Sequence, residues 1–78
     1  MDMDIAREVD ARGLNCPLPI LKAKKALAEL QGGQLLKVLC TDPGSMRDFE
    51  AFARQTGHAL VEQTARDGQF IHILRRRA

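Results

Sequence analysis

The fold is decided by the stretch IAREVDARGLNCPLPILKAKKALAEL, residues 5–30, in which an alternating segment is followed by a helical one. Over residues 5–11, most apolar side chains fall on one side of an extended chain, as in a half-buried strand. From Pro17 to Leu30, apolar side chains recur at steps of three and four, which is typical of a helix with one buried face. We therefore predict a strand, a break at Gly13 and then a helix.

The predicted helix over residues 17–30 has clear signals at both ends. Pro17 suits a first helical turn, where its missing N–H would have no partner in any case. The pair Gly32-Gly33 is typical of a chain leaving a helix. The expected buried stripe comprises Ile20, Ala23, Leu27 and Leu30, widened by Leu21 and Ala26.

The next apolar segment predicts a strand over residues 35–41, with Leu36, Val38 and Cys40 on its core side. A turn at residues 42–45 then opens a second helix, which Gly57 closes. Two caps are open for this helix: Asp42, or Ser45 together with Asp48 three residues later. Its buried stripe is Met46, Phe49, Phe52 and Ala53.

Two further strands are predicted over residues 58–65 and 69–75, joined by a hairpin at Asp67-Gly68. The order is strand, helix, strand, helix, strand, strand. A strand–helix–strand unit with short loops implies a parallel pair, whereas the hairpin adds antiparallel strands. We predict an α/β (α+β) two-layer sandwich, βαβαββ, with a four-stranded mixed sheet and two helices on one face. The whole chain, residues 1–78, forms a single domain.

Composition excludes several functional classes. The 78 residues are 45% hydrophobic and 28% charged, which is typical of a globular domain and not of a disordered chain. A net charge of +2, with three Phe and no Trp or Tyr, makes direct nucleic-acid binding unlikely. No run reaches the roughly 18 apolar residues of a membrane span, and the acidic start is unlike a secretory signal. We expect a cytoplasmic monomer.

The segment Gly13-Leu14-Asn15-Cys16-Pro17-Leu18-Pro19 contains the candidate chemical group, a cysteine at the start of a helix. The helix dipole favours a thiolate there, and Lys22, Lys24 and Lys25 add positive charge. The prolines stiffen the loop but provide no N–H. The sequence predicts a moderately activated nucleophile, exposed on a rigid corner.

Sulfur exchange suits this cysteine better than acyl transfer, because no catalytic relay accompanies it. His58 and His72 fall in predicted strands, and no metal-ligand spacing is present. Exchange at sulfur needs only a thiolate, access and a partner that delivers sulfur. The alternative is that Cys16 fills a gap at a helix start. For Cys40, a buried packing role is favoured over a resolving thiol.

The motif Cys16-Pro17-Leu18-Pro19, with Gly13-Leu14 and Asp10 before it, resembles the Cys-Pro-x-Pro signature of the TusA/SirA-like family of sulfur carriers. Asp42-Pro43 and Arg47-Asp48-Phe49 resemble the family's second characteristic stretch. The resemblance extends over most of the chain, from Asp10 to about Arg75.

This resemblance implies a persulfide on Cys16, supplied by a cysteine desulfurase and passed to an acceptor protein. The relay often leads toward tRNA 2-thiouridine; other members serve molybdenum cofactor supply or sulfur oxidation. Leu18 departs from the acidic residue frequent in tRNA-relay members. Gly13, Pro17 and Pro19 would shape the loop, while Leu18, Lys22 and Arg47 would contact partners. No cofactor or metal is implied, and the protein would be a sulfurtransferase-type carrier without a substrate pocket.

Two other hypotheses stay open. The first is a regulatory or protein-interaction module of the same fold, in which Cys16 has no covalent role. The second is RNA binding through Arg75, Arg76 and Arg77, whose simpler interpretation is a solvated, frayed terminus.

Overall fold

Four strands and two helices alternate along the chain, and the computed structural model describes residues 4–78. The elements are β1 (Ile5–Ala11), α1 (Leu18–Ala28), β2 (Leu35–Cys40), α2 (Ser45–Thr56), β3 (Ala59–Arg66) and β4 (Gln69–Arg75). Within these residues, no helix has the length and apolar character needed to cross a membrane.

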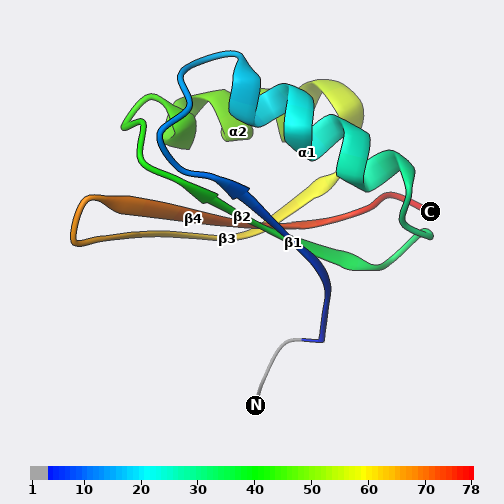
Figure 1. Cartoon of the computed structure of the whole chain (residues 1–78). Coiled ribbons are helices and arrows are strands. Elements are labelled where there is room, and N and C mark those ends of the chain that lie inside the picture. The colour runs from blue at the N-terminus through cyan, green and yellow to red at the C-terminus, as the bar shows by residue number, and fades with distance from the viewer. Residues whose placement is uncertain (1–3) are drawn as a thin grey trace.

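The strands form one mixed sheet in the order β1-β2-β4-β3. β1 and β2 are parallel because α1 carries the chain back between them, whereas β4 is antiparallel to both β2 and β3. Both helices lie on the same face of the sheet, and the other face is uncovered by helices (Figure 1). The predicted α+β two-layer architecture is confirmed.

The core lies between the sheet and the helices. Leu36, Val38 and Cys40 point toward the helices and are fully buried, which confirms the predicted core side of this strand. They pair with residues of β4 that share the same face. The remaining members of the cluster are Ala11, Ala23, Ala26, Leu27, Leu30, Phe49, Phe52, Ala53 and Leu74.

α1 is shorter than the predicted helix over residues 17–30. Its last turn tightens, with Glu29 N–H donating to Ala26 O and Leu30 N–H to Leu27 O, both at 3.1 Å. These three-residue spacings end the α-helix, although Leu30 still reaches the core. Leu21 is 53% exposed, so its predicted place in the buried stripe is wrong.

The start of α2 differs from both predicted caps. Its cap position is Gly44, and no side chain caps it. Asp42 Oδ1 instead accepts a hydrogen bond from Gly44 N–H at 3.0 Å, which closes the preceding turn. The Ser45 side chain turns inward and is buried. β3 begins at Ala59, one residue later than predicted, so His58 lies just before the strand.

The C-terminal segment is tied to the fold, so the predicted frayed terminus is wrong. Arg76 N–H donates to Gln34 O at 2.9 Å, and Gly33 N–H donates to Arg76 O at 2.8 Å. The Arg76 guanidinium donates to Leu30 O, and so binds a carbonyl beyond the end of α1. Arg77 N–H donates to His58 Nδ1 at 3.1 Å. Arg75 thus belongs to β4, Arg76 extends the backbone pairing beyond it, and Arg77 is bonded to a side chain.

Candidate functional site

The loop between β1 and α1 carries Cys16, which is exposed as predicted. Gly13 turns the chain with a φ of 81°, in the left-handed region that glycine adopts most readily. Its N–H donates to Thr41 Oγ1 at 2.8 Å, which joins this loop to the end of β2. Leu18 N–H donates to Asn15 O at 2.9 Å across the cysteine. The backbone on both sides of Cys16 is therefore fixed.

The two prolines hold different positions in this loop. Pro17 is the N-cap residue of α1 and is exposed, and its peptide bond to Cys16 is cis. Pro19 is already inside the helix and is buried against the core. Between them, Leu18 is 47% exposed beside the cysteine, and Leu21 is exposed one turn further along α1. Cys16 thus has uncharged, accessible side chains near it.

The predicted activation of Cys16 is wrong in direction. Hydrogen bonding to the Asp48 side chain, partial removal from water and the negative charges of Asp48 and Asp42 raise the pKa of the Cys16 thiol. Both carboxylates come from the start of α2 and the turn before it. These acidic groups therefore favour the thiol form of Cys16.

The basic side chains of Lys22 and Arg12, near the loop, are bonded to Asp10 at the end of β1. Lys22 Nζ donates to Asp10 O at 3.3 Å. Arg12 forms an ion pair with Asp10 at 2.9 Å, and its hydrogen bonds hold the pKa of that carboxyl at about 2. Lys22 thus lies near the loop, but its ammonium group contacts the strand end and not the thiol.

Arg47 lies exposed at the start of α2. With Pro43, Gly44, Met46 and Asp48 it lines an open hollow of about 460 Å³. Asp48, which raises the pKa of the Cys16 thiol, is one of the residues that line this hollow. The predicted partner residue Arg47 and the predicted nucleophile therefore belong to one area of the surface.

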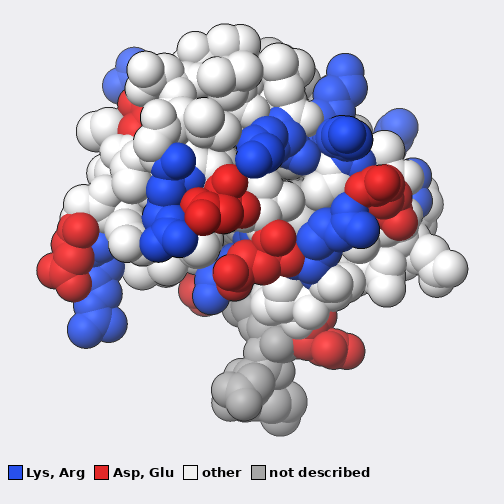
Figure 2. All heavy atoms as spheres, in the orientation of Figure 1, with Lys and Arg blue, Asp and Glu red and all other residues white. Residues whose placement is uncertain are grey.

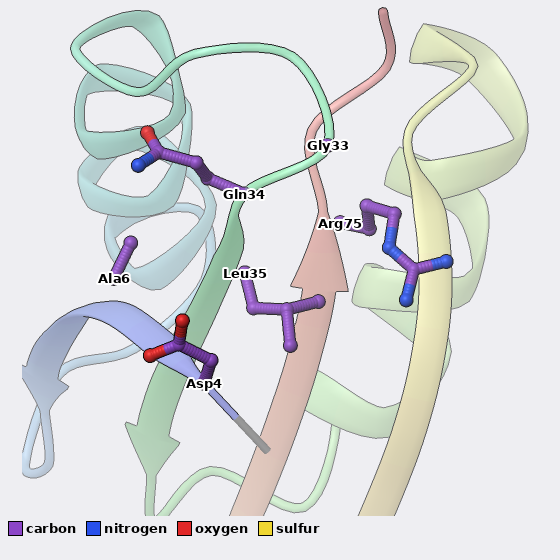
Figure 3. A pocket seen from close by; sticks show the side chains of 6 residues that line it. All are labelled: Asp4, Ala6, Gly33, Gln34, Leu35 and Arg75. Carbon is purple, nitrogen blue, oxygen red and sulfur yellow. The ribbon is translucent and has the colours of Figure 1, made fainter.

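A second hollow, of about 300 Å³, lies near the beginning of β2 and the end of β4. It contains none of the predicted site residues and is far along the strands from the Cys16 loop. Asp4, Ala6, Gly33, Gln34, Leu35 and Arg75 line it (Figure 3). Elsewhere on the face shown in Figure 2, acidic and basic groups are interspersed, and uncharged atoms cover much of the top, above the helices. No large basic patch appears on this face.

A network of buried, hydrogen-bonded polar side chains lies behind the site, and the sequence analysis did not predict it. His72, on β4, is fully buried and stacks on Phe49 with ring centroids 4.5 Å apart. Its Nε2 lies 2.9 Å from Ser45 Oγ, and its Nδ1 lies 3.2 Å from Gln63 Nε2. Gln63 Nε2 also donates to Met46 O at 2.8 Å, which identifies it as the amide nitrogen. His72 Nδ1 is then the acceptor, and Nε2–H donates to Ser45.

Cys40 lies at the end of this hydrogen-bond network, next to Ser45. Its predicted burial is confirmed, with none of the residue exposed. Burial raises the pKa of the Cys40 thiol, and a hydrogen bond from Ser45 acts in the opposite direction. Burial also lowers the pKa of His72 to about 4, so the ring is neutral near pH 7. Among residues 4–78, no group of three or more His, Cys, Asp or Glu side chains could hold a metal ion.

The effect of Asp48 on the pKa of Cys16 was also absent from the predicted site. Asp48 was assigned to helix capping or surface charge. One signal was available, because the segment Arg47-Asp48-Phe49 carried part of the family resemblance. Nothing in the spacing of the sequence, however, places the first turn of α2 against the loop before α1.

The fold is similar to that of a solved protein. The crystal structure of a SirA-like protein from Desulfitobacterium hafniense superposes with a TM-score of 0.81 at 31% sequence identity. The match covers 92% of this chain and 99% of that one. A fold with two helices on one face of a mixed sheet is thus shared with this SirA-like protein.

Sequence comparison identifies the family. The sequence model described as sulfurtransferase TusA matches residues 7–76. The sulfur carrier protein TusA of Allochromatium vinosum is 52% identical over 73 residues, covering 94% of this chain and 96% of that protein. A putative sulfur carrier protein of Neisseria meningitidis is 56% identical over 66 residues, covering 85% and 89%. The chain belongs to the TusA sulfurtransferase family.

Proposed function

We propose that the protein is a sulfur carrier that accepts sulfane sulfur from a cysteine desulfurase as a Cys16 persulfide and passes it to an acceptor protein. A relay toward tRNA 2-thiouridine is the route that we favour. The observation that carries the proposal is the exposed Cys16 thiol on a fixed loop. The identity of about half the residues with a sulfur carrier of Allochromatium vinosum supports it.

The site suits transfer between thiols. Thiol–persulfide exchange needs an accessible sulfur and a partner, and it needs no oxyanion hole. The Cys16 sulfur attacks the terminal sulfur of the donor persulfide, the donor S–S bond breaks, and a new S–S bond forms on Cys16. The proton of the Cys16 thiol ends on the donor thiol that leaves, so no external oxidant or reductant is consumed.

Partner recognition would rest on the surface around the loop. Leu18 and Leu21 are exposed beside Cys16 and would be covered on docking. Arg47, in the adjacent hollow, would add a charged contact. The contact would be small, on the order of 1,200 Å² or less, because the carrier must dissociate to reach its next partner. Direct binding of nucleic acid is not part of the proposal.

The test is intact-protein mass spectrometry after incubation with a cysteine desulfurase and cysteine, under non-reducing conditions. Wild type, Cys16→Ser and Cys40→Ser are compared. The proposal predicts a reductant-reversible gain of sulfur in wild type and Cys40→Ser, and none in Cys16→Ser. A Cys16→Ser variant that still gains and passes sulfur would overturn it.

The same assay separates the alternative, a protein-interaction module without sulfur chemistry. If wild type gains no sulfur from the desulfurase, a small polysulfide replaces it as donor. Loading by polysulfide at Cys16 keeps the carrier chemistry and rejects only the donor. If polysulfide also adds no sulfur, the carrier function is rejected and the interaction module is favoured. In that case Cys16→Ser would retain biological activity, whereas Arg47→Ala would lose it.

A further inference from the structure

Thr41 follows directly after β2, and its side chain bonds the loop that carries Cys16. The backbone pairing of β1 with β2 ends at Ala11 and Cys40, where both strands end. Beyond this pair, Thr41 Oγ1 accepts a hydrogen bond from Gly13 N–H at 2.8 Å and gives that backbone group a partner. The Thr41 hydroxyl therefore extends the connection between the two strands into the loop.

The other hydrogen bonds of the Cys16 loop stay within the loop and its flanking elements. Leu14 N–H donates to Ala11 O at 3.3 Å, and Leu18 N–H donates to Asn15 O at 2.9 Å. These bonds shape the loop but do not connect it to the rest of the surface. Among the hydrogen bonds of residues 4–78, the bond to Thr41 is the one that links residues 13–17 with residues 41–44.

Thr41 also leads into the turn before α2, which is itself held by hydrogen bonds. Gly44 N–H donates to Asp42 Oδ1 at 3.0 Å, and Ser45 N–H donates to Asp42 O at 2.9 Å. Gly44 lines the open hollow that contains Arg47. Because Thr41 directly precedes this turn, its bond to the Cys16 loop sets how that loop sits relative to the wall of the hollow.

We propose that Thr41 is a positioning residue of sulfur transfer: its hydroxyl fixes the Cys16 loop relative to the turn before α2, so that a donor protein meets the thiol and the hollow in one arrangement. The inference rests on the proposed function. The transfer step is unchanged: the Cys16 sulfur attacks the terminal sulfur of the donor persulfide, and the donor thiol leaves with the proton. A protein donor needs both surfaces aligned, whereas a small donor needs only the sulfur.

The first arm of the test measures the hydrogen bond itself and needs no sulfur donor. Amide hydrogen exchange at Gly13 is followed by NMR in wild type, Thr41→Val and Thr41→Ser. Valine keeps the branched shape of threonine but offers no oxygen, so the exchange rate of Gly13 N–H should rise several-fold. Serine keeps the hydroxyl and should restore slow exchange. Equal rates in wild type and Thr41→Val overturn the proposal.

The second arm compares two sulfur donors, a cysteine desulfurase with cysteine and inorganic polysulfide. With the desulfurase, kcat/KM of Thr41→Val should fall several-fold, mainly through a raised KM for the carrier, because docking must first align the two loops. Polysulfide should load Thr41→Val at the wild-type rate, and Thr41→Ser should recover the desulfurase rate. Unchanged desulfurase kinetics in Thr41→Val, or an equal loss with both donors, overturns the positioning role.

The matched control is Thr64→Val, the same chemical change on another strand. Thr64 lies on β3, at the opposite edge of the sheet from β1, and its Oγ1 donates only to the Glu62 carboxylate at 3.5 Å. Both Gly13 exchange and desulfurase loading should stay at their wild-type values in this variant. A loss of loading in Thr64→Val equal to that in Thr41→Val would show a general effect of removing a hydroxyl and overturn the proposal.

Wild type separates this proposal from the proposed function. If wild type gains sulfur from both donors and Thr41→Val behaves identically, the carrier function stands and only the role of Thr41 fails. If wild type gains sulfur from polysulfide alone, the desulfurase is the wrong donor, and the docking role of Thr41 is rejected with it. Sulfur gain from neither donor rejects the carrier function, a result that the exchange of Gly13 does not share.

Discussion

The two cysteines of this chain differ in almost every physical respect. Cys40 ends β2, where it pairs with Ala11 of β1, and Cys16 follows only five residues after Ala11. Cys16 is exposed, whereas Cys40 is fully buried. Both thiols have a raised pKa, but the first cause is the hydrogen bond with Asp48 at Cys16 and burial at Cys40.

This difference shows why only one of the two thiols can carry sulfur between proteins. Burial at Cys40 is relieved only when the strand opens, which costs a large share of the stability of the fold. Cys16 lies at the surface, so a partner protein can reach its sulfur without opening the fold. The same chemical group is therefore structural in one place and available in the other.

The largest expected contrast is in alkylation under native conditions. We expect iodoacetamide to modify Cys16 on the order of 10³-fold faster than Cys40, because Cys40 reacts only after the core opens. The measurement is mass spectrometry of Cys16→Ser and Cys40→Ser, each of which has one thiol. In a denaturant the two rates should converge. Comparable native rates would contradict the burial of Cys40.

His72, in the buried hydrogen-bond network, should make the free energy of unfolding depend on pH. The pKa of His72 is lowered to about 4 from 6.5, so the unfolded chain binds the proton more readily. Stability is therefore complete above about pH 6.5 and decreases as the pH falls toward 4. Between about pH 7 and about pH 5 we expect a loss of about 2 kcal/mol in the free energy of unfolding.

Urea unfolding at the two pH values measures this loss. His72→Gln should flatten the pH dependence, whatever its effect on stability at neutral pH. His58→Gln is the control, because His58 is only partly buried and its lowered pKa contributes a smaller change in the same direction. A slope that survives in His72→Gln would assign the titration to another group.

Serine substitution at each cysteine gives the next contrast. Cys40→Ser places a hydroxyl among buried apolar side chains, so we expect a loss of about 1–2 kcal/mol in the free energy of unfolding. Cys16→Ser changes an exposed loop position and should alter stability by less than about 0.5 kcal/mol. Urea denaturation of both variants provides the measurement. Equal losses would mean that the Cys16 loop is packed more tightly than its exposure indicates.

The smallest expected effect concerns the turn that presents Cys16. Gly13 and Gly68 have φ values of 81° and 76°, and no atom lies within 4 Å of where a Cβ would be added. Alanine at either position should therefore cost about 1 kcal/mol through backbone strain alone. Only Gly13→Ala should also change the alkylation rate of Cys16, because it disturbs the loop that carries the thiol.

Gly68→Ala is the matched control for this prediction, since it carries the same strain in the β3–β4 turn. The two variants should match in urea unfolding and differ in the alkylation of Cys16. An unchanged alkylation rate in Gly13→Ala would show that Gly13 does not govern the position of the thiol.

Most of the fold follows from local patterns. β1 and β4 have the predicted bounds, because alternation and the turns around Gly13 and Gly68 are signals within a few residues. The end of α1 was placed two residues too late, since Leu30 continues the apolar stripe after the backbone has left the α-helix. Periodicity reports which side chains are buried and does not report the hydrogen bonding of the last turn.

The chemical surroundings of Cys16 could be predicted only in part. Exposure followed from the loop position, but the dipole of its own helix indicated the wrong direction for the pKa. The decisive group, Asp48, is 32 residues away in sequence and reaches the thiol only once both helices pack on the sheet. The hydrogen-bond network from Gln63 through His72 to Ser45 likewise joins residues of different elements, so no local pattern of the sequence contains it.

The measurement that tests the central claim most directly is the mapping of added sulfur by tryptic peptides. Cleavage after Arg12 and Lys22 yields GLNCPLPILK, residues 13–22, and cleavage after Lys37 and Arg47 yields VLCTDPGSMR, residues 38–47. After sulfur loading and alkylation with iodoacetamide, we predict the extra sulfur on the first peptide and a Cys40 without extra sulfur on the second. Sulfur on the Cys40 peptide, with Cys16 unmodified, would contradict the assignment.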